Sequence, residues 1–209
     1  MKSLVVGLGF GQLYVNILKR MGHEVITVDI NPDSNADFTE LTTAISAHNS
    51  FDTAHVCVPN HLHYKTALKL ADHTKIVFVE KPGVETINHW RLLTNLNKST
   101  RFMMTKNNQW RNNIKQIAEN CEASDMIQIN WVNKNRIPGP GTWFTDKSKA
   151  FGGVSRDLLP HLMSIMMSVN KNTYQDFKVQ KYHTEQRWNL SDCTGTDYGV
   201  VNENGVYDV

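Results

Sequence analysis

The sequence predicts an α/β fold: a doubly wound parallel sheet in the N-terminal half, followed by a shortened α+β domain with an open, largely antiparallel sheet. Two observations support this fold class. Short apolar runs alternate with helical patterns through the first half of the chain, as in βαβ units. After about residue 107 the alternation stops, and longer strand patterns mix with helices and a hairpin signal. We therefore expect two domains, 1–106 and 107–209.

Five strands and three helices account for most of the first half. The strand patterns are SLVVGLG, EVITVD, AHVCVP, KIVFVEKP and RFMMTK, and continuous apolar runs of this kind are typical of strands covered on both faces. The helical patterns are FGQLYVNILKRMG, HYKTALKLADH and INHWRLLTNLNK. In the first helix Gly22 is a typical stop, and four apolar residues recur at helical spacing. These are Leu13, Ile17, Leu18 and Met21.

The second half is expected to hold two helices, two strands and a terminal hairpin. In chain order these are a helix at 109–121, a strand at 126–135, a helix at 153–169, a strand at 177–186 and a hairpin at 198–209. The hairpin turn is assigned to Asn204 and Gly205, because an Asn-Gly pair favours two-residue turns.

Composition and charge exclude several classes of protein. The net charge is +2, and no cluster of Lys and Arg with interleaved aromatics predicts nucleic-acid binding. Three cysteines without CxxC spacing disfavour a disulfide framework or a zinc site and fit a reducing cytoplasm. We expect no metal, no signal peptide and no membrane span, since no apolar run approaches the ~18 residues that a span requires.

The segment GLGFGQ lies between the first strand and the first helix, where dinucleotide-binding folds place a glycine-rich turn. Gly7 would form the tight turn, and Gly9 would let the backbone approach a pyrophosphate at the helix N-terminus. The third glycine of this fingerprint is replaced by Gln12, with Gly11 beside it. We assign the turn, including Phe10, to cofactor binding. The alternative is a glycine-rich turn with a structural role only.

Asp29 ends the second strand, 20 residues after Gly9, where a carboxylate can accept hydrogen bonds from both ribose hydroxyls of an adenosine. No Arg or Lys follows in DINPDS to bind a 2′-phosphate. These residues therefore predict NAD as the cofactor rather than NADP. The alternative is a surface aspartate without a ligand.

The segment VCVPNHLHY turns from the third strand into a helix at the same carboxyl edge of the predicted sheet. Asn60 can cap that helix, and His61 and His63 either face solvent near the cap or contact a cofactor or substrate. A zinc site is disfavoured, because no further Cys or Glu ligand lies nearby. Residues of this segment assigned to cofactor binding are Val58, Pro59, Asn60 and His63.

Glu80, Lys81 and Pro82 follow the fourth strand without a polar spacer. Pro82 cannot donate to a ladder, so the strand ends there and two charges lie at the carboxyl edge of a buried sheet. Open α/β folds bind their ligands at that edge. We assign Glu80 and Lys81 to the cofactor-binding site at that edge.

In GGVSRDLLPH, Asp157 and His161 are four residues apart and share a helix face. A carboxylate there can orient the imidazole and raise its basicity, which suits a general base. The alternative is a surface ion pair, but flanking apolar residues indicate a largely buried helix, and Pro160 is expected to bend it. These flanking residues are Leu158, Leu159, Leu162, Ile165 and Met166.

The order of these motifs is GxGxx, an Asp after the second strand, PN-H-H, EKP and GG-x-x-x-D-x-x-x-H. It resembles the glucose–fructose oxidoreductase and inositol dehydrogenase family (Gfo/Idh/MocA) from Lys2 to about Val169. The resemblance implies an N-terminal Rossmann domain and NAD(P)-dependent hydride transfer to or from a sugar or cyclic polyol carbon. It implies catalytic roles for Lys81, Asp157 and His161.

The resemblance also implies a substrate site, and the chain departs from the family pattern in places. The implied substrate contacts are Lys81, Asn107, Trp143, Asp157 and His161. In MTKNNQWRNN, Asn107 and Trp110 fit the pattern, whereas Gln109 stands where an arginine is expected. Family members are usually longer, so some substrate-binding and dimerising surface is expected to be absent or rebuilt.

In the mechanism that these residues favour, His161 takes the hydroxyl proton of an alcohol, Asp157 orients His161, and Lys81 binds the alcohol oxygen. Two other functions stay open. One is a non-catalytic NAD-binding sensor or scaffold, which the shortened chain favours; the other is NAD-dependent cleavage of a glycosidic bond. We expect a cytoplasmic homodimer or higher homo-oligomer, assembled through residues after about 120, with a small-molecule partner.

Overall fold

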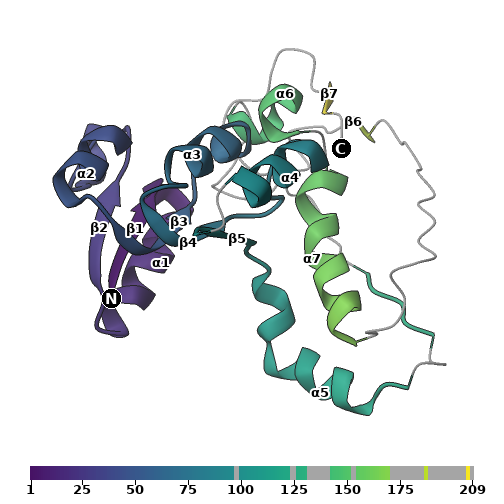
Figure 1. The fold of residues 1–209 in the computed structure, drawn as a ribbon. Coiled ribbons are helices and arrows are strands. Elements are labelled where there is room, and N and C mark those ends of the chain that lie inside the picture. Colours follow the sequence, from purple (N-terminus) through teal and green to yellow (C-terminus); the bar gives the residue numbers. More distant parts are fainter. Residues whose placement is uncertain are drawn as a thin grey trace. The chain divides into compact units, whose positions relative to one another are not determined.

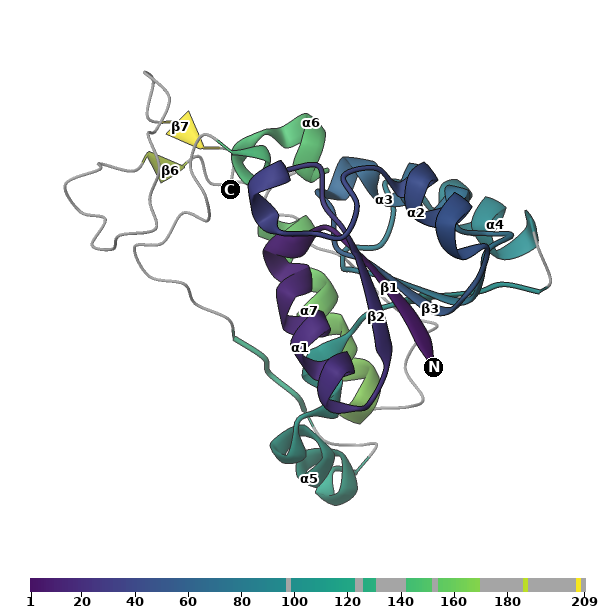
Figure 2. The ribbon, with the colours of Figure 1, turned by 90° about the vertical axis from the view of Figure 1, so that its left-hand side faces the viewer.

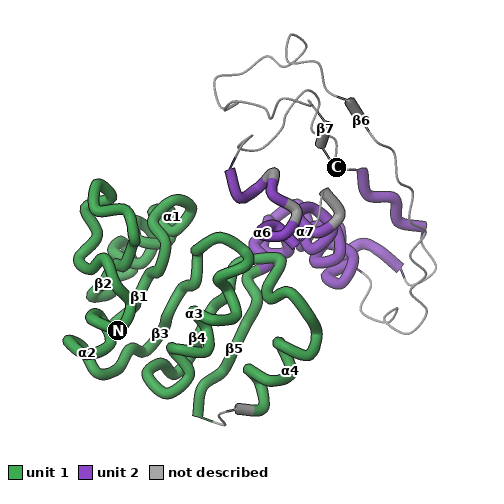
Figure 3. The backbone as a smooth tube through the Cα atoms, turned by 90° about the horizontal axis from the view of Figure 1, so that it is seen from above, with its two compact units in different colours: residues 1–105 green, residues 106–209 purple. Residues whose placement is uncertain are grey.

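The computed structural model describes residues 1–96, 99–122, 126–130, 142–151, 154–169, 186–187 and 206–207. Its contacts divide the chain into two units, Met1–Thr105 and Lys106–Val209, which Figure 3 distinguishes by colour. Each unit has its own set of helices and strands.

A five-stranded parallel sheet forms the centre of the first unit, as the apolar runs predict (Figure 1). Its strand order is β2-β1-β3-β4-β5, and each neighbouring pair is parallel. The chain reverses its direction of travel across the sheet between β1 and β3, which makes this the switch point of a doubly wound fold. The strands are β1 (Lys2–Val6), β2 (Glu24–Val28), β3 (Phe51–Val56), β4 (Thr74–Val79) and β5 (Arg101–Met104).

Helices lie on both sides of this sheet. Figure 2 shows α1 on one side and α2, α3 and α4 on the other. Strand β1 packs in both layers because its side chains alternate: Leu4 and Val6 join the cluster under α2, α3 and α4, and Val5 packs under α1. The helices are α1 (Leu8–Arg20), α2 (Leu41–His48), α3 (His63–Lys69) and α4 (Ile87–Leu96).

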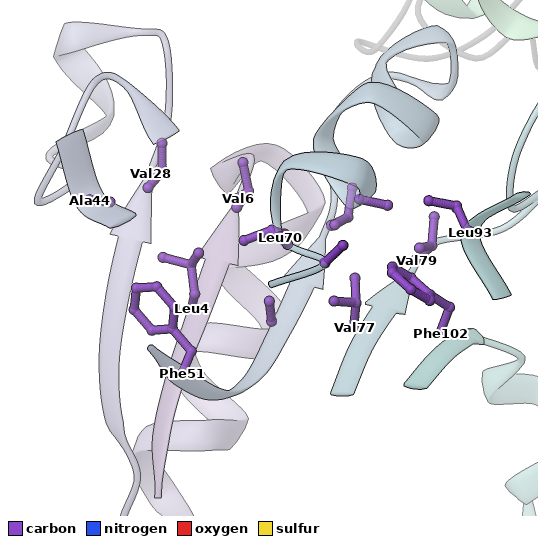
Figure 4. Packing of buried hydrophobic residues seen from close by; sticks show 14 of the residues in the cluster. Leu4, Val6, Val28, Ala44, Phe51, Leu70, Val77, Val79, Leu93 and Phe102 are labelled. Atoms are coloured by element: carbon purple, nitrogen blue, oxygen red, sulfur yellow. The ribbon is translucent and has the colours of Figure 1, made fainter. Parts of the chain in front are cut away.

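The larger hydrophobic core lies between the sheet and α2, α3 and α4 (Figure 4). Leu70 and Leu93 are fully buried there, in the same cluster as Val77 and Val79 of β4. Burying a side chain of leucine size stabilises a protein by about 1.5–3 kcal/mol. A smaller cluster under α1 consists of Val5, Leu8, Val15 and Leu18. Burial on both sides explains why the strand β1 has a continuous apolar sequence.

The helix α1 ends near its predicted stop but turns a different face to the sheet. Gly22 follows the helix with a φ of 79°, which confirms the stop. The predicted apolar stripe is wrong at two positions, since Leu13 and Met21 are 50% and 65% exposed. The residues of α1 that are buried are Leu8, Gly11, Val15 and Leu18.

The second unit is built around three helical segments that pack together. Helix α7 (Val154–Val169) contacts both α5 (Asn112–Asn120) and the 3-10 helix η3 (Asn107–Trp110). Two short helices, η4 (Trp143–Thr145) and α6 (Lys147–Ala150), precede α7 and contact each other.

The two helices predicted in this unit have different outcomes. The helix at 153–169 is confirmed as α7, with Pro160 inside it. The helix at 109–121 is divided, because Arg111 between η3 and α5 is extended with a ψ of 139°. Among the residues that the structure describes, no helix, α7 included, has the length and apolar character needed to span a membrane.

The strand predicted at 126–135 is wrong in its described part. Residues 126–130 lie outside helices and strands, and residues 131–135 fall outside the described residues. A strand requires a hydrogen-bonded neighbour, and residues 126–130 join no ladder within the described part of the chain. Alternating apolar residues alone therefore do not make this segment a strand.

A short antiparallel ladder joins β6 (Gln186–Arg187) to β7 (Val206–Tyr207). Strand β7 lies in the segment predicted as one arm of the terminal hairpin. The other arm and the predicted turn at Asn204 and Gly205 lie outside the described residues. The strand predicted at 177–186 likewise lies outside them, except for its last residue, which begins β6.

Candidate functional site

The carboxyl ends of the five strands lie in one row. The last residues of neighbouring strands are opposite each other in all four ladders, for example Val6 opposite both Val28 and Val56. The residues that follow them leave the sheet at one level, at the edge where open α/β folds bind ligands. In their order across the sheet, these residues are Asp29, Gly7, Cys57, Glu80 and Thr105, and together they are called the carboxyl row.

Gly7 makes the tight turn from β1 into α1 that the sequence predicts. Its φ is 92°, and its N–H donates to the carbonyl of Val28 at 2.8 Å. A Cβ atom on Gly7 would lie 2.7 Å from the carbonyl oxygen of Cys57. A side chain is thus excluded both by the backbone angle and by the neighbouring chain at the end of β3.

Gly9 and Gly11 have different surroundings, although both lie in the first turns of α1. A Cβ atom on Gly9 would meet nothing within 4 Å, so the helix N-terminus is open at this point. A Cβ atom on the buried Gly11 would lie 2.9 Å from Cγ1 of Val5 and 3.3 Å from Cβ of Cys57. Gly11 therefore permits the close helix–sheet packing that the dinucleotide fingerprint assigns to its third glycine.

Gln12, at the position of that third glycine, is exposed on the outer face of α1. Its Nε2 donates to Oδ1 of Asn16 at 3.2 Å. Gln12 therefore does not disturb the packing of α1 on the sheet, because the close contact is made by Gly11, one position earlier in the chain. Phe10 is 50% exposed and makes an edge-to-face contact with Tyr14, at 5.9 Å between ring centroids.

Asp29 directly contacts the glycine-rich turn. Its Oδ2 accepts the backbone N–H of Leu8 at 2.5 Å, and its Oδ1 accepts that of Asn31 at 2.8 Å. A carboxylate oxygen has two lone pairs, so each oxygen can still accept one hydroxyl. The next residue, Ile30, is 89% exposed. An apolar side chain so exposed beside Asp29 is a candidate for contact with the face of an adenine ring.

The turn after β3 differs from its predicted form at Asn60. Asn60 begins the 3-10 helix η2 (Asn60–Leu62), and α3 starts at His63, so Leu62 and not Asn60 occupies the N-cap of α3. The predicted capping role of Asn60 is wrong because this extra turn separates it from the helix. Asn60 is only 6% exposed, and Val58 and Pro59 before it are half-buried.

His63 is buried and connects two loops of the carboxyl edge. Its ring is 1% exposed, its Nδ1 lies 2.6 Å from the carbonyl oxygen of Gly83, and its Nε2 lies 2.8 Å from that of Val58. Burial is the main cause that lowers the pKa of His63. The solvent-exposed alternative is wrong for His63. His61 is half-buried, and its Nδ1 has no hydrogen-bond partner in the described part of the chain.

Glu80, the first residue of EKP, is held from three directions. The hydroxyls of Tyr14 and Thr105 both donate to its Oε1, the latter at 2.7 Å, and the backbone N–H of Lys81 donates to its Oε2 at 3.2 Å. Its own N–H donates to the carbonyl of Val56 at 3.0 Å. Glu80 thus connects α1, the end of β5 and the turn that carries Lys81.

Two ionisable groups near Glu80, the phenol of Tyr14 and the thiol of Cys57, stay neutral. Burial and then the charge of Glu80 raise the pKa of Tyr14 well above its ordinary value, and the same two causes raise the pKa of the Cys57 thiol. Tyr14 therefore remains a hydrogen-bond donor throughout the physiological range. Cys57 has little thiolate character and is chemically inert in this position.

Lys81 is half-buried and follows the carboxyl row directly, at the place predicted from the sequence. The other residues expected around the substrate belong to the second unit. Asn107 begins η3 and is exposed, and Trp143 begins η4 and stacks on Phe144 at 3.9 Å between ring centroids.

Asp157 and His161 lie one turn apart on α7, as their spacing predicts. Both side chains are half-buried, and Asp157 lies in the first turn, where the helix dipole favours a negative charge. The carbonyl of His161 accepts the hydroxyl of the buried Ser164 at 2.7 Å. The structure brings together Gly7, Gly9, Asp29, Glu80 and Lys81 at one edge of the first unit, and Asp157 with His161 on one helix of the second.

Sequence patterns miss Tyr14, Thr105 and Ile30 as candidate site residues. Tyr14 and Thr105 are found only through their common partner Glu80, which lies 66 and 25 residues away in the chain. Ile30 has a signal in the sequence, because this apolar residue directly follows Asp29, the aspartate that the sequence assigns to the cofactor site. That position is exposed in a fold of this type.

Comparison with known proteins places this geometry in a family. Residues 1–107 match the family model GFO_IDH_MocA, described as an oxidoreductase family with an NAD-binding Rossmann fold. A curated protein of Amycolatopsis mediterranei (strain S699), named as a UDP-kanosamine synthase oxidoreductase subunit, is 28% identical over 180 residues. That match covers 79% of this chain and 50% of the relative, so the chain spans about half the length of this relative.

Two solved structures share the fold at lower sequence identity. GenD2 from gentamicin A biosynthesis, in complex with NAD, is 22% identical with a TM-score of 0.65, covering 81% of this chain and 53% of that protein. The WlbA (WbpB) dehydrogenase of Thermus thermophilus, in complex with NAD and UDP-GlcNAcA, is 17% identical with a TM-score of 0.62. It is covered over 62% of its length, and 81% of this chain is covered.

The fold class and the family resemblance predicted from the motifs are thus confirmed, and the predicted cofactor, NAD, agrees with the description of the family. The glycine-rich turn, Asp29 and the EKP turn all lie within the matched residues. This chain belongs to the Gfo/Idh/MocA family of oxidoreductases with an NAD-binding Rossmann fold.

Proposed function

We propose that this chain acts as an NAD-dependent oxidoreductase that transfers a hydride between nicotinamide and an alcohol or carbonyl carbon of a sugar or cyclic polyol. The observation that carries the proposal is the carboxyl row. An open helix N-terminus, the carboxylate of Asp29 and the EKP turn lie at one edge of a sheet, in a chain that belongs to a family of NAD-binding oxidoreductases.

The residues of the first unit fit NAD. Gly9 leaves open space where the first N–H groups of α1 have no partner within the helix, which suits the pyrophosphate. Asp29 would accept the ribose hydroxyls, and Ile30 would contact the adenine. No lysine or arginine occurs from residue 30 to residue 64, so a 2′-phosphate would find no partner there and Asp29 would repel it. We therefore propose NAD over NADP.

Lys81 is the proposed hydrogen-bond donor to the substrate oxygen. An ammonium group that donates to the alcohol oxygen stabilises the negative charge that builds there as the hydroxyl proton is removed. Its position directly after Glu80, at the end of β4, supports this role. The bound nicotinamide supplies the hydride chemistry itself.

His161 is the proposed general base, with Asp157 as the residue that orients it. An imidazole can take the hydroxyl proton at neutral pH, and a carboxylate one helical turn away stabilises the imidazolium that forms. Their half-buried positions on α7 support this assignment. The roles of Lys81, Asp157 and His161 rest on the family and on the local geometry within each unit.

The proposed substrate class is a sugar carried by a nucleotide or a free cyclic polyol. The names of similar proteins support it: one is a UDP-kanosamine synthase oxidoreductase subunit, and one dehydrogenase was crystallised with UDP-GlcNAcA. Substrate contacts by Asn107 and Trp143, a homo-oligomer built through residues after about 120, and a cytoplasmic location stay predictions.

A turnover screen with the purified chain tests the proposed function. The protein is incubated with NAD⁺ and UDP-sugars, free sugars or inositols, or with NADH and their keto forms, while nicotinamide absorbance is followed. We expect turnover with at least one member of these classes, faster with NAD than with NADP. Tight NADH binding without turnover on any of them would favour the sensor or scaffold instead.

A further inference from the structure

Glu80 directly precedes Lys81, and its side chain accepts hydrogen bonds from three other residues of the chain, Lys81 among them. Its Oε1 accepts two hydroxyls, from Tyr14 and Thr105, and its Oε2 accepts the backbone N–H of Lys81. These donors come from three segments that are far apart in the sequence: α1, the residue after β5, and the EKP turn. All three belong to the first unit.

The position of Tyr14 links this carboxylate to the proposed dinucleotide site. Tyr14 lies three residues after Gly11, on the side of α1 that faces the sheet. Its ring packs 5.0 Å from the ring of His55 and 5.9 Å from that of Phe10, measured between centroids. The helix whose N-terminus would bind the pyrophosphate therefore also directs a hydroxyl to the residue before Lys81.

Thr105 supplies the second hydroxyl from the opposite side. Its backbone N–H donates to the carbonyl of Val79 at 2.9 Å, so its position is fixed by the end of β4. Its Oγ1 is 2.7 Å from Oε1 of Glu80. A half-buried carboxylate that lost these donors would have to move toward water, since an unsatisfied buried charge is costly.

We propose that Tyr14 and Thr105 are positioning residues, which hold Glu80 and through it the turn that presents Lys81 to the nicotinamide end of the cofactor. The inference rests on the proposed function, because it takes Lys81 to lie beside the nicotinamide. The raised pKa of Tyr14 agrees with it, since the phenol stays protonated and keeps donating to Glu80.

Comparing the binding of two ligands, NADH and ADP-ribose, distinguishes a role in positioning Lys81 from a role in stabilising the fold. NADH carries the nicotinamide, whereas ADP-ribose carries only the adenosine, pyrophosphate and second ribose. Hydroxyls that act through Lys81 should affect NADH more than ADP-ribose. Hydroxyls that merely stabilise α1 should affect both ligands equally, because both use the N-terminus of that helix.

The experiment is isothermal titration calorimetry of the full chain with NADH and with ADP-ribose. Tyr14→Phe and Thr105→Val each remove one hydroxyl and keep the shape. We expect each variant to bind NADH at least fivefold more weakly relative to ADP-ribose. The affinity for ADP-ribose should stay within twofold of the wild-type value. Thr105→Ser retains the hydroxyl and should restore NADH affinity. Tyr64→Phe, on α3 at the other face of the sheet, is the matched control and should change neither ligand.

A double-mutant cycle with Lys81→Met tests whether the effect passes through Lys81. In that background Tyr14→Phe should cause no further loss of NADH affinity, because the group that it positions is already gone. Additive losses, equal weakening of NADH and ADP-ribose, or no weakening at all would each overturn the positioning role. Wild-type protein that bound neither ligand would instead overturn the proposed function and this inference with it.

Discussion

The Nδ1 atom of His63 lies 2.6 Å from the carbonyl oxygen of Gly83, which joins the start of α3 to the turn that follows Lys81. The other ring nitrogen lies 2.8 Å from the carbonyl oxygen of Val58. A neutral imidazole has one N–H and can donate to only one of these carbonyls, whereas the imidazolium could donate to both. Burial lowers the pKa of His63 and favours the neutral form. Two loops of the candidate site thus depend on one buried ring.

Replacing this ring should destabilise the first unit. We expect His63→Ala to lower the free energy of unfolding by about 2–4 kcal/mol, because it leaves a cavity and removes the N–H donor from one of the two carbonyls. Urea denaturation followed by circular dichroism measures this change. His61→Ala, at the neighbouring half-buried histidine, is the control and should cost less. A loss below about 0.5 kcal/mol for His63→Ala would show that the ring does not hold the loops.

Two glycines of α1 should respond in opposite ways to alanine. Gly11→Ala places a methyl group 2.9 Å from Cγ1 of Val5 and should destabilise the protein by about 1–3 kcal/mol. Gly9→Ala meets nothing within 4 Å and should leave the free energy of unfolding unchanged or slightly raised, because alanine favours helix. The methyl group introduced by Gly9→Ala should weaken NADH binding at least tenfold, because it occupies the proposed pyrophosphate position.

Thermal unfolding and NADH titration of the two variants check this pair of predictions. Gly9→Ala with full NADH affinity would contradict the pyrophosphate assignment. Gly11→Ala with unchanged stability would contradict the packing role assigned to Gly11 in place of the third fingerprint glycine.

His55 should make folding sensitive to acid. Its ring is 8% exposed, stacks on Phe78 at 5.0 Å between centroids, and has no hydrogen-bond partner for either nitrogen within the described residues. Burial, with a smaller contribution from His23, lowers the pKa of His55 to about 4. The unfolded chain therefore takes up the proton first as the pH falls. Stability is complete above the unfolded pKa of about 6.5 and declines below it.

The loss between pH 7.5 and pH 5 should be about 2 kcal/mol from His55 alone. His55→Phe keeps an aromatic ring between Tyr14 and Phe78 but cannot be protonated. Relative to the wild type, the free energy of unfolding of His55→Phe should rise by that amount as the pH falls from 7.5 to 5. Urea denaturation at each pH measures this difference. A constant difference would mean that the ring is protonated equally in both states.

Cofactor choice follows from Asp29 and its surroundings. We expect NADH to bind at least tenfold more tightly than NADPH, a difference of about 1.4 kcal/mol. Asp29→Asn should reduce the difference in affinity between NADH and NADPH, because it removes the charge that repels a 2′-phosphate and keeps the size of the side chain. Calorimetric titration with both cofactors measures the ratio, and equal affinities in the wild type would contradict the assignment.

The sequence predicts the first unit well because burial leaves a direct mark on it. Strands covered on both faces have continuous apolar runs, and glycines and prolines mark their ends, so all five strands and the EKP turn are recovered. The packing role of Gly11 is not recovered, because it depends on its distance from Val5 and Cys57 across two elements. The burial of His63 is also missed, because it depends on two loops that close over the start of α3, and the start of a helix usually faces water.

Short or unpaired segments are predicted poorly. Helix α2 buries only Ala44 and shows too little periodicity to be recognised. Residues 126–130 have alternating apolar side chains but no ladder in the part of the chain that is described. Tyr14 looks like one more residue of an amphipathic helix until its hydroxyl is seen on Glu80, 66 residues later.

The rate of hydride transfer by Lys81→Ala and His161→Ala tests the central claim most directly. On the substrate found in the turnover screen, each variant should reduce kcat by roughly 100-fold or more, since one loses charge stabilisation and the other the base. His161→Ala should keep NADH affinity within a few-fold, because His161 serves the substrate. Wild-type turnover that persists undiminished in either variant from pH 6 to 9 would contradict the mechanism at that residue.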